Sequence, residues 1–401
     1  MAISSQSLRT PAPWASSRSR GRSSDGTSRS VVVGLSFPRI EPPADTDGSA
    51  SREFAYEAEP LRGAYSWPPA AAAGQKTRAP SGGQFHASAA VTQRRLLACR
   101  GHAGSDMPPF LRLDVPAREP AAAVLPVPYE RTTSWGRGTE NGPGALLVAS
   151  DYVELYDEEL DAEPCQIGIE TLPPVDVGGS DESVLRRISA AAEATLRDGR
   201  FLAAVGGEHT VTPALVRGAR DATERDLGVV QFDAHADLRQ TYGGTAWNHA
   251  CAMSRVLDLG LPTLAVGIRS LTRPEAARIA NEGLPIIWAE QLDALPRPEL
   301  EVLFEGLLAS LPDTVYLTFD LDFFDPSVLP ATGTPEPGGG TWYQALALLR
   351  RLFDRKRVIA MDVVELAPIP DNPASDFTAA KLLYKCIGYR FRRELAGMPG
   401  T

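Results

Sequence analysis

Aspartates and histidines that could bind a metal ion gather in short segments, each directly after an apolar run of the sequence. The clearest segment is QFDAHADL, in which Asp233, His235 and Asp237 stand at alternate positions. In an extended backbone, side chains two positions apart project to the same side about 7 Å from each other, which is close enough to share ions. The chain holds only 5 histidines in 401 residues, so a histidine between two aspartates suggests a metal ligand.

Three further segments carry similar groups after apolar runs: GGEHT, DLD and MDVVE, the last of which ends at Glu365. The candidate metal ligands are therefore His209, Asp233, His235, Asp237, Asp320 and Asp322. This oxygen-rich set suits Mn²⁺ better than a zinc ion held by thiolates. Its four carboxylates would also balance the charge of two divalent ions.

Each of these residues has a structural explanation as well. A single histidine at the end of a strand is more often a hydrogen-bonded structural residue than a ligand, and an aspartate there often caps the following helix. The scarcity of histidine favours the metal site. The histidines after residue 106 are His209, His235 and His249, and each lies in a segment of this kind.

The elements that must position these residues follow from the alternation of apolar runs with amphipathic helical segments. Strands are predicted at 121–128, 201–209, 228–235, 263–270, 314–322 and 357–366, with an apolar run at 284–289. Helices are predicted at 183–199, 274–283, 299–311, 341–354 and 376–395, and a polar, glycine-rich loop at 129–147. This pattern is typical of a parallel sheet covered on both faces. We predict a three-layer α/β/α domain with a mainly parallel central sheet and a site beyond the carboxyl ends of its strands.

Charge and composition divide the chain near residue 106. The net charge is −10, of which residues 1–106 contribute +5 and residues 107–401 contribute −15. Because the first part is rich in Ser and Arg and has no apolar period, we predict a disordered, low-complexity extension over 1–106 and a catalytic domain over 107–401. The extension is either an organelle transit peptide or a dispensable segment before a true start at Met107. We favour the second, and with it a cytoplasmic location.

The composition argues against several other classes of protein. The 4 cysteines lie far apart without CxxC spacing, which indicates reduced thiols and not a zinc or disulfide framework. No apolar run is long enough to span a bilayer, and the acidic balance argues against a nucleic-acid partner. The same acidity is compatible with a small cationic substrate.

The motifs GGEHT, DAHAD, TFDLDFFDP and ATGTPEPGG, in this order, resemble those of the arginase/agmatinase (ureohydrolase) family. The similarity continues in LPVPYERTTSWGRGTENGPGALLVASDYVELYDEEL and SDFTAAKLLYKCIGY, and it spans roughly Ala121 to Arg393. It implies an arginase/deacetylase-like fold with two Mn²⁺ per subunit. The ligands implied are His209 and Asp237 for one ion, His235 and Asp322 for the other, and Asp233 and Asp320 as bridges.

The resemblance also implies hydrolysis of a guanidino compound to urea and an amine. The two ions hold a water and lower its pKa, so that hydroxide attacks the guanidinium carbon. His249 matches the family's proton-shuttling histidine and, with the ligand Asp237, is a candidate catalytic residue. Glu365 matches the carboxylate that binds the guanidinium group, a planar cation suited to bidentate contact. The alternatives are a structural loop histidine at 249 and a surface-paired glutamate at 365.

Substrate choice depends on the position two residues after DAHAD. Arginases have an asparagine there that helps hold the substrate carboxylate, whereas this chain has Arg239. The loop therefore resembles the agmatinase branch, as do VELYDEEL and NHACAMSR. We predict conversion of agmatine to putrescine and urea, a step of polyamine biosynthesis, with Arg239 as a candidate substrate-binding residue. The resemblance further implies a homo-oligomer, a trimer or hexamer.

Other activities stay open at this stage. Guanidinobutyrate, guanidine and arginine are alternative substrates, because enzymes that act on them share the metal motifs. A different metal hydrolase on the related deacetylase-like architecture and a non-catalytic, metal-binding family member are two further alternatives. Release of urea discriminates the different metal hydrolase. The intact ligand set argues against the non-catalytic member, and the observation to make is whether the purified protein retains about two manganese ions.

Overall fold

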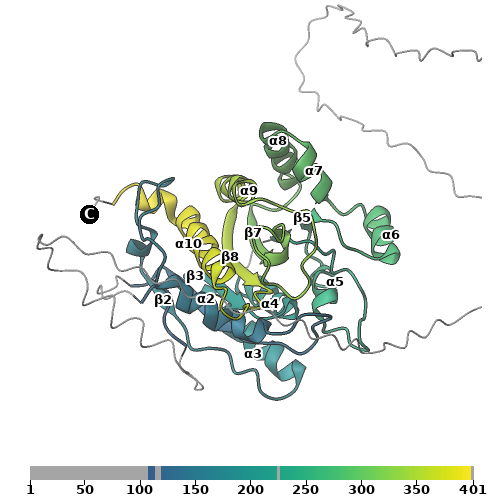
Figure 1. Cartoon of the computed structure of the whole chain (residues 1–401), viewed down its shortest axis with the longest axis horizontal. Coiled ribbons are helices and arrows are strands. Elements are labelled where there is room, and N and C mark those ends of the chain that lie inside the picture. The colour runs from purple at the N-terminus through teal and green to yellow at the C-terminus, as the bar shows by residue number, and fades with distance from the viewer. Residues whose placement is uncertain (1–106, 113–118, 224–225, 399–401) are drawn as a thin grey trace, which may run out of the picture. The chain divides into compact units, whose positions relative to one another are not determined.

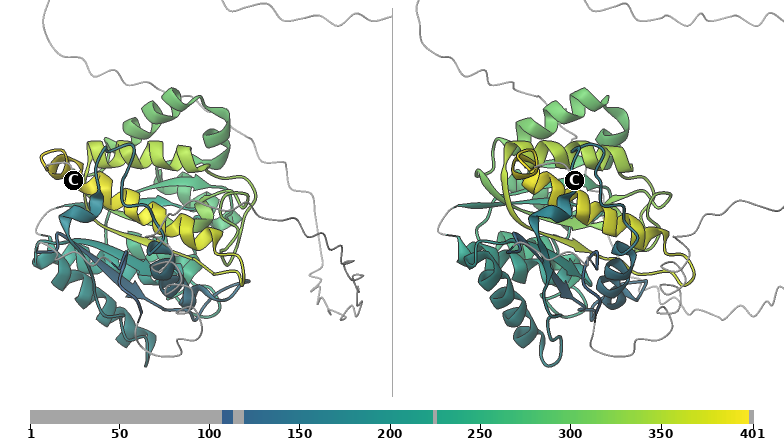
Figure 2. Two further views of the ribbon diagram at one scale, coloured as in Figure 1. Left: turned by 60° about the vertical axis from the view of Figure 1, so that its left-hand side comes forward. Right: turned by 90° about the vertical axis from the view of Figure 1, so that its left-hand side faces the viewer.

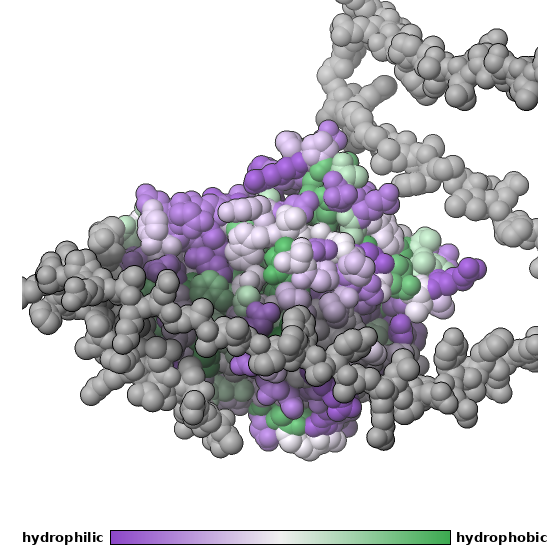
Figure 3. Space-filling view, in the orientation of Figure 1, coloured by the Kyte–Doolittle hydropathy of each residue, from purple (hydrophilic) through white to green (hydrophobic). Residues whose placement is uncertain are grey.

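The computed structural model describes residues 107–112, 119–223 and 226–398 (Figure 1). The extension predicted over residues 1–106 lies outside the described residues, so its disorder and the domain boundary after it stay predictions. Within the described part of the chain, no helix combines the length and the apolar character that crossing a membrane requires. Figure 3 shows one face of the described residues as mostly hydrophilic, with small apolar areas.

In the described residues, eight strands form one sheet in which every neighbouring pair is parallel. The strands are β1 (Ala122–Val127), β2 (Ile169–Thr171), β3 (Phe201–Gly206), β4 (Leu227–Phe232), β5 (Thr263–Ile268), β6 (Ile286–Trp288), β7 (Thr314–Asp320) and β8 (Arg357–Val364). Their order in the sheet is β2-β1-β3-β8-β7-β4-β5-β6. The predicted parallel sheet is confirmed.

Helices cover both faces of the sheet and confirm the three-layer prediction. One apolar core contains side chains of α2 (Gly142–Ser150), α7 (Ala289–Ala294), α8 (Arg297–Leu308), α9 (Trp342–Arg355) and α10 (Ala374–Leu395). The other contains side chains of α3 (Asp181–Arg197), α4 (Thr212–Ala222), α5 (Ala252–Leu257) and α6 (Arg273–Glu282). Figures 1 and 2 show α8 and α9 on one side of the sheet and α3 on the other.

The strands supply both cores because successive side chains of a strand point to opposite faces. In β7, Val315, Leu317 and Phe319 belong to the core with α8 and α9, whereas Tyr316 belongs to the core with α3 and α4. A strand buried on both faces needs apolar residues at almost every position, which explains the continuous apolar runs in the sequence.

The structure differs from the prediction in the segment 129–147. The predicted loop ends early, because α2 begins at Gly142 with a proline in its first turn, where the missing N–H of Pro143 is tolerated. The short strand β2 and the helices α4, α5 and α7 were not predicted either. Helix α4 begins with Thr212 and Pro213, and this proline in the first turn was an available signal for its start.

Candidate metal centre

The four central strands of the sheet, β3, β8, β7 and β4, are consecutive neighbours, and their carboxyl ends meet at one edge. His209 follows β3, Glu365 follows β8, Asp320 ends β7 and Asp233 follows β4. These residues are far apart in the sequence. The sheet order brings them together at the carboxyl ends of the strands, where the sequence predicted a site, although the strand order itself was not predicted.

A phenylalanine directly before each of two aspartates supports this edge of the sheet. Phe232 of β4 pairs in register with Phe319 of β7, and their rings stack with centroids 5.2 Å apart. Phe323 packs edge-on against both rings. Such packing restricts the backbone at Asp233 and Asp320, which follow the two stacked residues.

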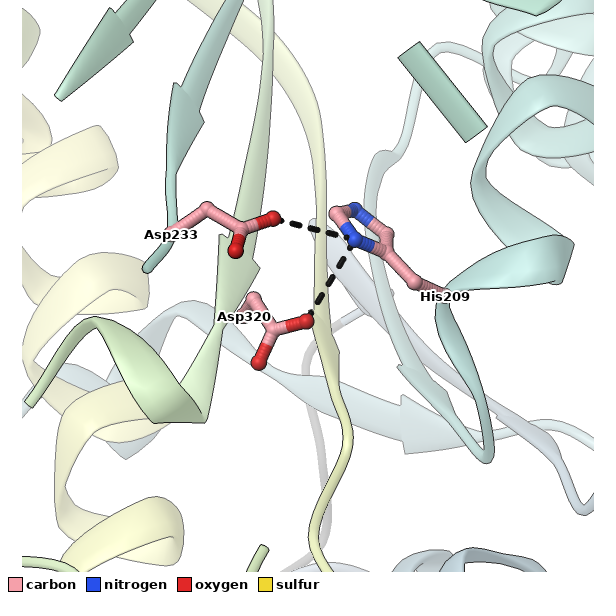
Figure 4. Close-up of side chains that lie close together, drawn as sticks. All are labelled: His209, Asp233 and Asp320. Atoms are coloured by element: carbon pink, nitrogen blue, oxygen red, sulfur yellow. Dashed lines mark ion pairs between the residues drawn. The ribbon is translucent and has the colours of Figure 1, made fainter. Parts of the chain in front are cut away.

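The imidazole of His209 lies among three carboxylates. Figure 4 shows two of them, Asp233 and Asp320. Its Nδ1 atom is 3.2 Å from Oδ2 of Asp233 and 3.3 Å from Oδ2 of Asp320. The same atom is 3.0 Å from Oδ2 of Asp237. His209 is buried, and within the described part of the chain its Nδ1 atom has no partner with hydrogen-bond geometry. A buried nitrogen that faces three carboxylate oxygens in this way fits a cation between them.

The other nitrogen of His209 explains why Nδ1 is available. Nε2 lies 2.9 Å from the hydroxyl of Thr318, and that hydroxyl donates its hydrogen to Oδ1 of Asp362 at 2.7 Å. Thr318 can therefore only accept from the ring, which places the proton of the neutral imidazole on Nε2 and the lone pair on Nδ1. Partners of this kind orient metal-binding histidines in proteins. The residues present therefore fit a metal ion.

His235 has a similar environment on the other side of Asp233. Its Nδ1 atom is 2.9 Å from Oδ2 of Asp322 and 3.7 Å from Oδ1 of Asp233. The described residues contain two groups whose ligand atoms lie within 4.8 Å of one another, namely His209 with Asp233 and Asp320, and His235 with Asp233 and Asp322. Asp233 belongs to both groups. This position suits the bridging role that the sequence implied for it.

The alternative explanation, that an aspartate caps the turn that follows it, also holds for Asp233 and Asp320. In each of them one carboxylate oxygen makes the capping hydrogen bond. Oδ1 of Asp233 accepts from the backbone N–H of His235 at 2.5 Å, and Oδ1 of Asp320 accepts from that of Asp322 at 3.0 Å. In both residues it is Oδ2 that lies near Nδ1 of His209. One carboxylate thus serves the local turn and the ligand cluster together.

Two residues of the site have strained backbones. Asp237 has φ 52° and Glu365 has φ 66°, in the left-handed region that side chains other than glycine rarely adopt. The surroundings hold both: the carbonyl of Asp237 accepts from the N–H of Ser254 at 3.0 Å, and the N–H of Glu365 donates to Gly207 at 2.8 Å. Strain of about 1–3 kcal/mol per residue persists at functional sites when the fold enforces it.

The buried carboxylates repel one another in the absence of a cation. Burial and the nearby Asp322 raise the pKa of Asp233 to about 7. Burial likewise raises the pKa values of Asp320 and Glu365 well above their usual range. Burial by itself lowers the pKa of His235, but the Asp322 carboxylate outweighs it and raises that pKa to about 10. The site carries more negative charge than its protein surroundings balance, which again fits divalent cations.

A pocket of about 230 Å³ opens above the candidate ligands. His249 and Glu365 line it, together with Ser134 and Arg239. Neither of the two ligand groups found in the described residues includes His249, whose Nε2 atom lies 2.8 Å from the Ser134 hydroxyl. Burial lowers the pKa of His249 below its usual value. His249 and Glu365 thus line the same pocket as candidate metal ligands, and their roles as proton carrier and guanidinium-binding group stay predictions.

Arg239 lies on the pocket wall but already has partners within the chain. Its guanidinium group stacks on the ring of Tyr242 at 4.2 Å, and its Nε atom is 3.9 Å from Glu275. Glu275 is buried and accepts hydrogen bonds from the backbone of Leu238 and Thr272. The structure therefore holds Arg239 at the wall of the pocket by contacts that need no substrate.

Sequence reasoning missed Asp362, although it stands in the segment MDVVE. Its carboxylate is buried and accepts from the hydroxyls of Tyr316, Thr318 and Thr212 at 2.7–2.9 Å. The available signal was a charged residue within an apolar strand, since charged side chains are almost never fully buried unless they are paired with other polar groups. Glu208 of GGEHT, which follows β3 and is also completely buried, was missed as well.

Comparisons with known proteins agree with this geometry. Residues 120–388 match the model of the Arginase family. The chain is 42% identical over 275 residues to the N(1)-aminopropylagmatine ureohydrolase of Synechocystis, a match that covers 67% of this chain and 89% of that protein. It is 32% identical over 273 residues to the agmatinase of Pyrococcus horikoshii, covering 67% and 92%. The solved agmatine ureohydrolase of Thermoplasma volcanium matches with a TM-score of 0.63 and 29% identity, covering 70% and 93%.

Proposed function

This chain is a ureohydrolase of the arginase family, and from that premise we propose that it hydrolyses the guanidino group of a carboxylate-free, agmatine-type cation to urea and an amine. One observation carries the proposal. The buried carboxylate of Glu365 and the imidazole of His249 face the same pocket as the candidate metal ligands. A guanidinium group held by Glu365 would therefore lie beside both the metal centre and a proton carrier.

The residues of the chain divide the work of this reaction. Two manganese ions, when bound by the six aspartates and histidines, supply a nucleophilic hydroxide near neutral pH by lowering the pKa of water. Glu365 binds the guanidinium group and orients it: Oε1 already accepts from the N–H of His209, which fixes the carboxylate and leaves Oε2 free of that contact. His249 brings the proton that the leaving amine needs.

The pocket supports a substrate without a carboxylate. Apart from the candidate metal ligands, the charged residues that line it are Glu275, Glu365 and Arg239, and the guanidinium group of Arg239 stacks on Tyr242 and lies near Glu275. The carboxylate of Glu275, beside Arg239 on the pocket wall, would repel an amino-acid carboxylate, whereas it would attract a second amine at the far end of the substrate. Agmatine, which would give putrescine, is therefore favoured over arginine.

A second candidate substrate is N(1)-aminopropylagmatine, which would give spermidine. The 42% identical Synechocystis relative carries the name of this activity, and the 32% identical Pyrococcus relative carries the name agmatinase. Both substrates present the same guanidino group to Glu365 and differ only at the amine end. Both would place the enzyme in polyamine biosynthesis.

The test is a panel of guanidino compounds with manganese-loaded enzyme. We expect urea from agmatine or N(1)-aminopropylagmatine with a kcat/KM well above that for arginine, guanidinobutyrate or guanidine. Metal analysis of the same sample should find about two manganese ions per chain. A preference for arginine would overturn the substrate proposal, and a metal-loaded protein that releases no urea from any compound would overturn the activity.

We further propose a homo-oligomer, a trimer or hexamer, with no nucleic-acid or membrane partner. The family resemblance supports the assembly, and the acidic charge supports the absence of nucleic acid. A cytoplasmic location is proposed because the cysteines lie far apart without CxxC spacing, which indicates reduced thiols. Light scattering coupled to size-exclusion chromatography tests the assembly, and a monomer would overturn it.

A further inference from the structure

His249 resembles His209 in its hydrogen bonds. Behind His209, a buried carboxylate, Asp362, binds a threonine that contacts the ring, and Glu208 and Thr132 make the same arrangement behind His249. Glu208 is completely buried, and its two oxygens have different partners. Oε2 accepts from the backbone N–H groups of Arg131 at 2.8 Å and Thr132 at 2.7 Å. Oε1 accepts from the hydroxyls of Thr132 at 2.7 Å and Thr210 at 2.6 Å. The carboxylate therefore takes up the only hydrogen of each hydroxyl.

This arrangement decides what Thr132 offers to His249. The Thr132 oxygen accepts from the backbone N–H of His249 at 3.2 Å and lies 3.3 Å from Nδ1 of the ring. Because its hydrogen goes to Glu208, the oxygen can only accept from the ring as well. The proton of the neutral imidazole is then on Nδ1, and the lone pair is on Nε2.

The unprotonated nitrogen is the one on the pocket side. Nε2 lies 2.8 Å from the hydroxyl of Ser134, and both Ser134 and His249 line the pocket above the metal centre. A proton carrier must present an unprotonated nitrogen before it accepts a proton and the same nitrogen when it gives the proton up.

We propose that Glu208 is a positioning residue that acts through Thr132: it fixes the proton of His249 on Nδ1 and so keeps Nε2 as the nitrogen that carries protons. In each turnover Nε2 accepts a proton from water in the pocket, which makes the ring an imidazolium cation and leaves the hydroxide that attacks the guanidinium carbon. It then gives that proton to the nitrogen of the leaving amine and returns to the neutral form. The inference rests on the proposed function, because it needs His249 to be the proton carrier.

Glu208→Gln should reverse the direction of the hydrogen bonds from residue 208 through Thr132 to His249. The two side chains have almost the same shape. The two backbone N–H groups next to Oε2 need an acceptor, so the amide oxygen of the glutamine must take that place. Its NH₂ group then occupies the place of Oε1 and donates to Thr132. The Thr132 hydroxyl is freed to donate to Nδ1 of His249, which moves the ring proton to Nε2.

The first experiment measures kcat, KM and manganese content of the full-length, metal-loaded variants. Glu208→Gln should lower kcat by roughly 10²-fold, within the range for a lost acid–base group, and leave KM and manganese content unchanged. Thr132→Val should lower kcat in the same way, whereas Thr132→Ser, which keeps the hydroxyl, should retain it. Unchanged kcat in Glu208→Gln and Thr132→Val would overturn the proposal.

The second experiment asks whether Glu208 acts through His249. In a His249→Ala background, Glu208→Gln should cause no further loss of kcat, because the residue it positions is gone. A full, additive loss in the double variant would show that Glu208 acts by another route, such as the shape of the 131–134 loop, and would overturn the proposal.

A spectroscopic measurement separates this proposal from the proposed function. With only 5 histidines in the chain, ¹⁵N-histidine NMR of the full-length, metal-free protein can report the protonated nitrogen of each ring. We expect the proton of neutral His249 on Nδ1 in the wild type and on Nε2 in Glu208→Gln. The same tautomer in both would overturn the proposal even if the wild type releases urea. A wild type that releases no urea would instead overturn the function and leave this readout intact.

Discussion

The backbone N–H of His209 donates a hydrogen bond of 2.6 Å to Oε1 of Glu365, so a candidate metal ligand after β3 and a substrate-binding candidate after β8 are fixed to each other. The reciprocal strand contact is the N–H of Glu365, which donates to the carbonyl of Gly207 at 2.8 Å. These two hydrogen bonds hold the strained backbone of Glu365 and aim its carboxylate at the pocket. Glu365 lies next to the two ligand groups found in the described residues and belongs to neither, so its role in substrate binding can be tested separately from metal binding.

Glu365→Gln should leave both manganese ions in place and weaken binding of the guanidinium group. The glutamine oxygen can still accept from His209, but the charge that pairs with the substrate is lost. A hydrogen bond to a charged group contributes about 1.5–3 kcal/mol, so kcat/KM should fall by roughly 10–100-fold or more. Urea release and metal analysis of the same sample check this.

Asp320→Asn is the contrasting variant for that experiment. An amide is a poor anionic ligand, and Oδ2 of Asp320 is the atom that faces His209. We expect loss of manganese together with activity. If Glu365→Gln loses the metal and Asp320→Asn keeps it, the two roles are reversed.

Asp362→Asn should weaken manganese binding, because the carboxylate of Asp362 accepts from the Thr318 hydroxyl, which in turn contacts the candidate ligand His209. An asparagine NH₂ group can donate to the Thr318 hydroxyl, which then donates to Nε2 of His209 and moves the ring proton toward the metal position. Loss of such a partner typically costs 10–100-fold in metal affinity. Tyr316→Phe is the matched control, since it removes another hydroxyl from Asp362 and leaves the Thr318 contact in place. Equal effects of the two variants would contradict the role of Thr318.

His249→Ala should retain both manganese ions and near-normal substrate binding, while kcat falls by roughly 10²–10⁴-fold. Added imidazole should restore part of the activity, because a small base can occupy the space of the side chain. His235→Ala should instead lose an ion and resist rescue, since its Nδ1 atom lies 2.9 Å from Asp322 within a ligand group. Metal loss from His249→Ala, or an unchanged kcat, would require another proton carrier.

Manganese affinity should rise with pH across the neutral range. In the metal-free site the pKa of Asp233 is raised to about 7 and that of His235 to about 10, so at pH 6 both hold protons that a cation must displace. As the pH passes 7, Asp233 ionises and one of these competing protons disappears. Calorimetric titration in two buffers of different ionisation enthalpy should show proton release at pH 7. Binding without proton release, or an affinity that falls with pH, would contradict these shifts.

Lys385→Met should destabilise the fold far from the pocket. The ammonium group of Lys385 lies 3.0 Å from Oδ1 of Asp157, and both side chains are almost completely buried. Without the lysine, a buried carboxylate is left unpaired, which costs about 3–5 kcal/mol of the free energy of unfolding. Glu158→Gln is the control: Glu158 also pairs with Lys385, but its side chain is 72% exposed, so its loss should hardly change the melting temperature. Equal melting temperatures for Lys385→Met and the wild type would contradict the role of the pair.

Local patterns determined the fold class and the candidate ligands from the sequence alone. Apolar runs such as that of β7 reveal a strand buried on both faces, and the alternation in QFDAHADL keeps its polar side chains close by covalent geometry. A residue that follows a parallel strand lies at the carboxyl edge of the sheet in any strand order. Asp233, His235 and Asp320 could therefore be identified as candidate ligands by residue type and spacing.

Only the tertiary structure decided which strand ends are neighbours and which hydroxyls lie behind the histidines. Strand β8 inserts between β3 and β7, so Glu365 meets His209 across 156 positions of the chain. Thr318 reaches His209 across 109 positions and Thr132 reaches His249 across 117. Such contacts depend on strand order and on how helices pack between distant segments, for which the sequence has no local period. Threonine hydroxyls are common on buried strands and loops, and only their distances show which of them fix a ring proton.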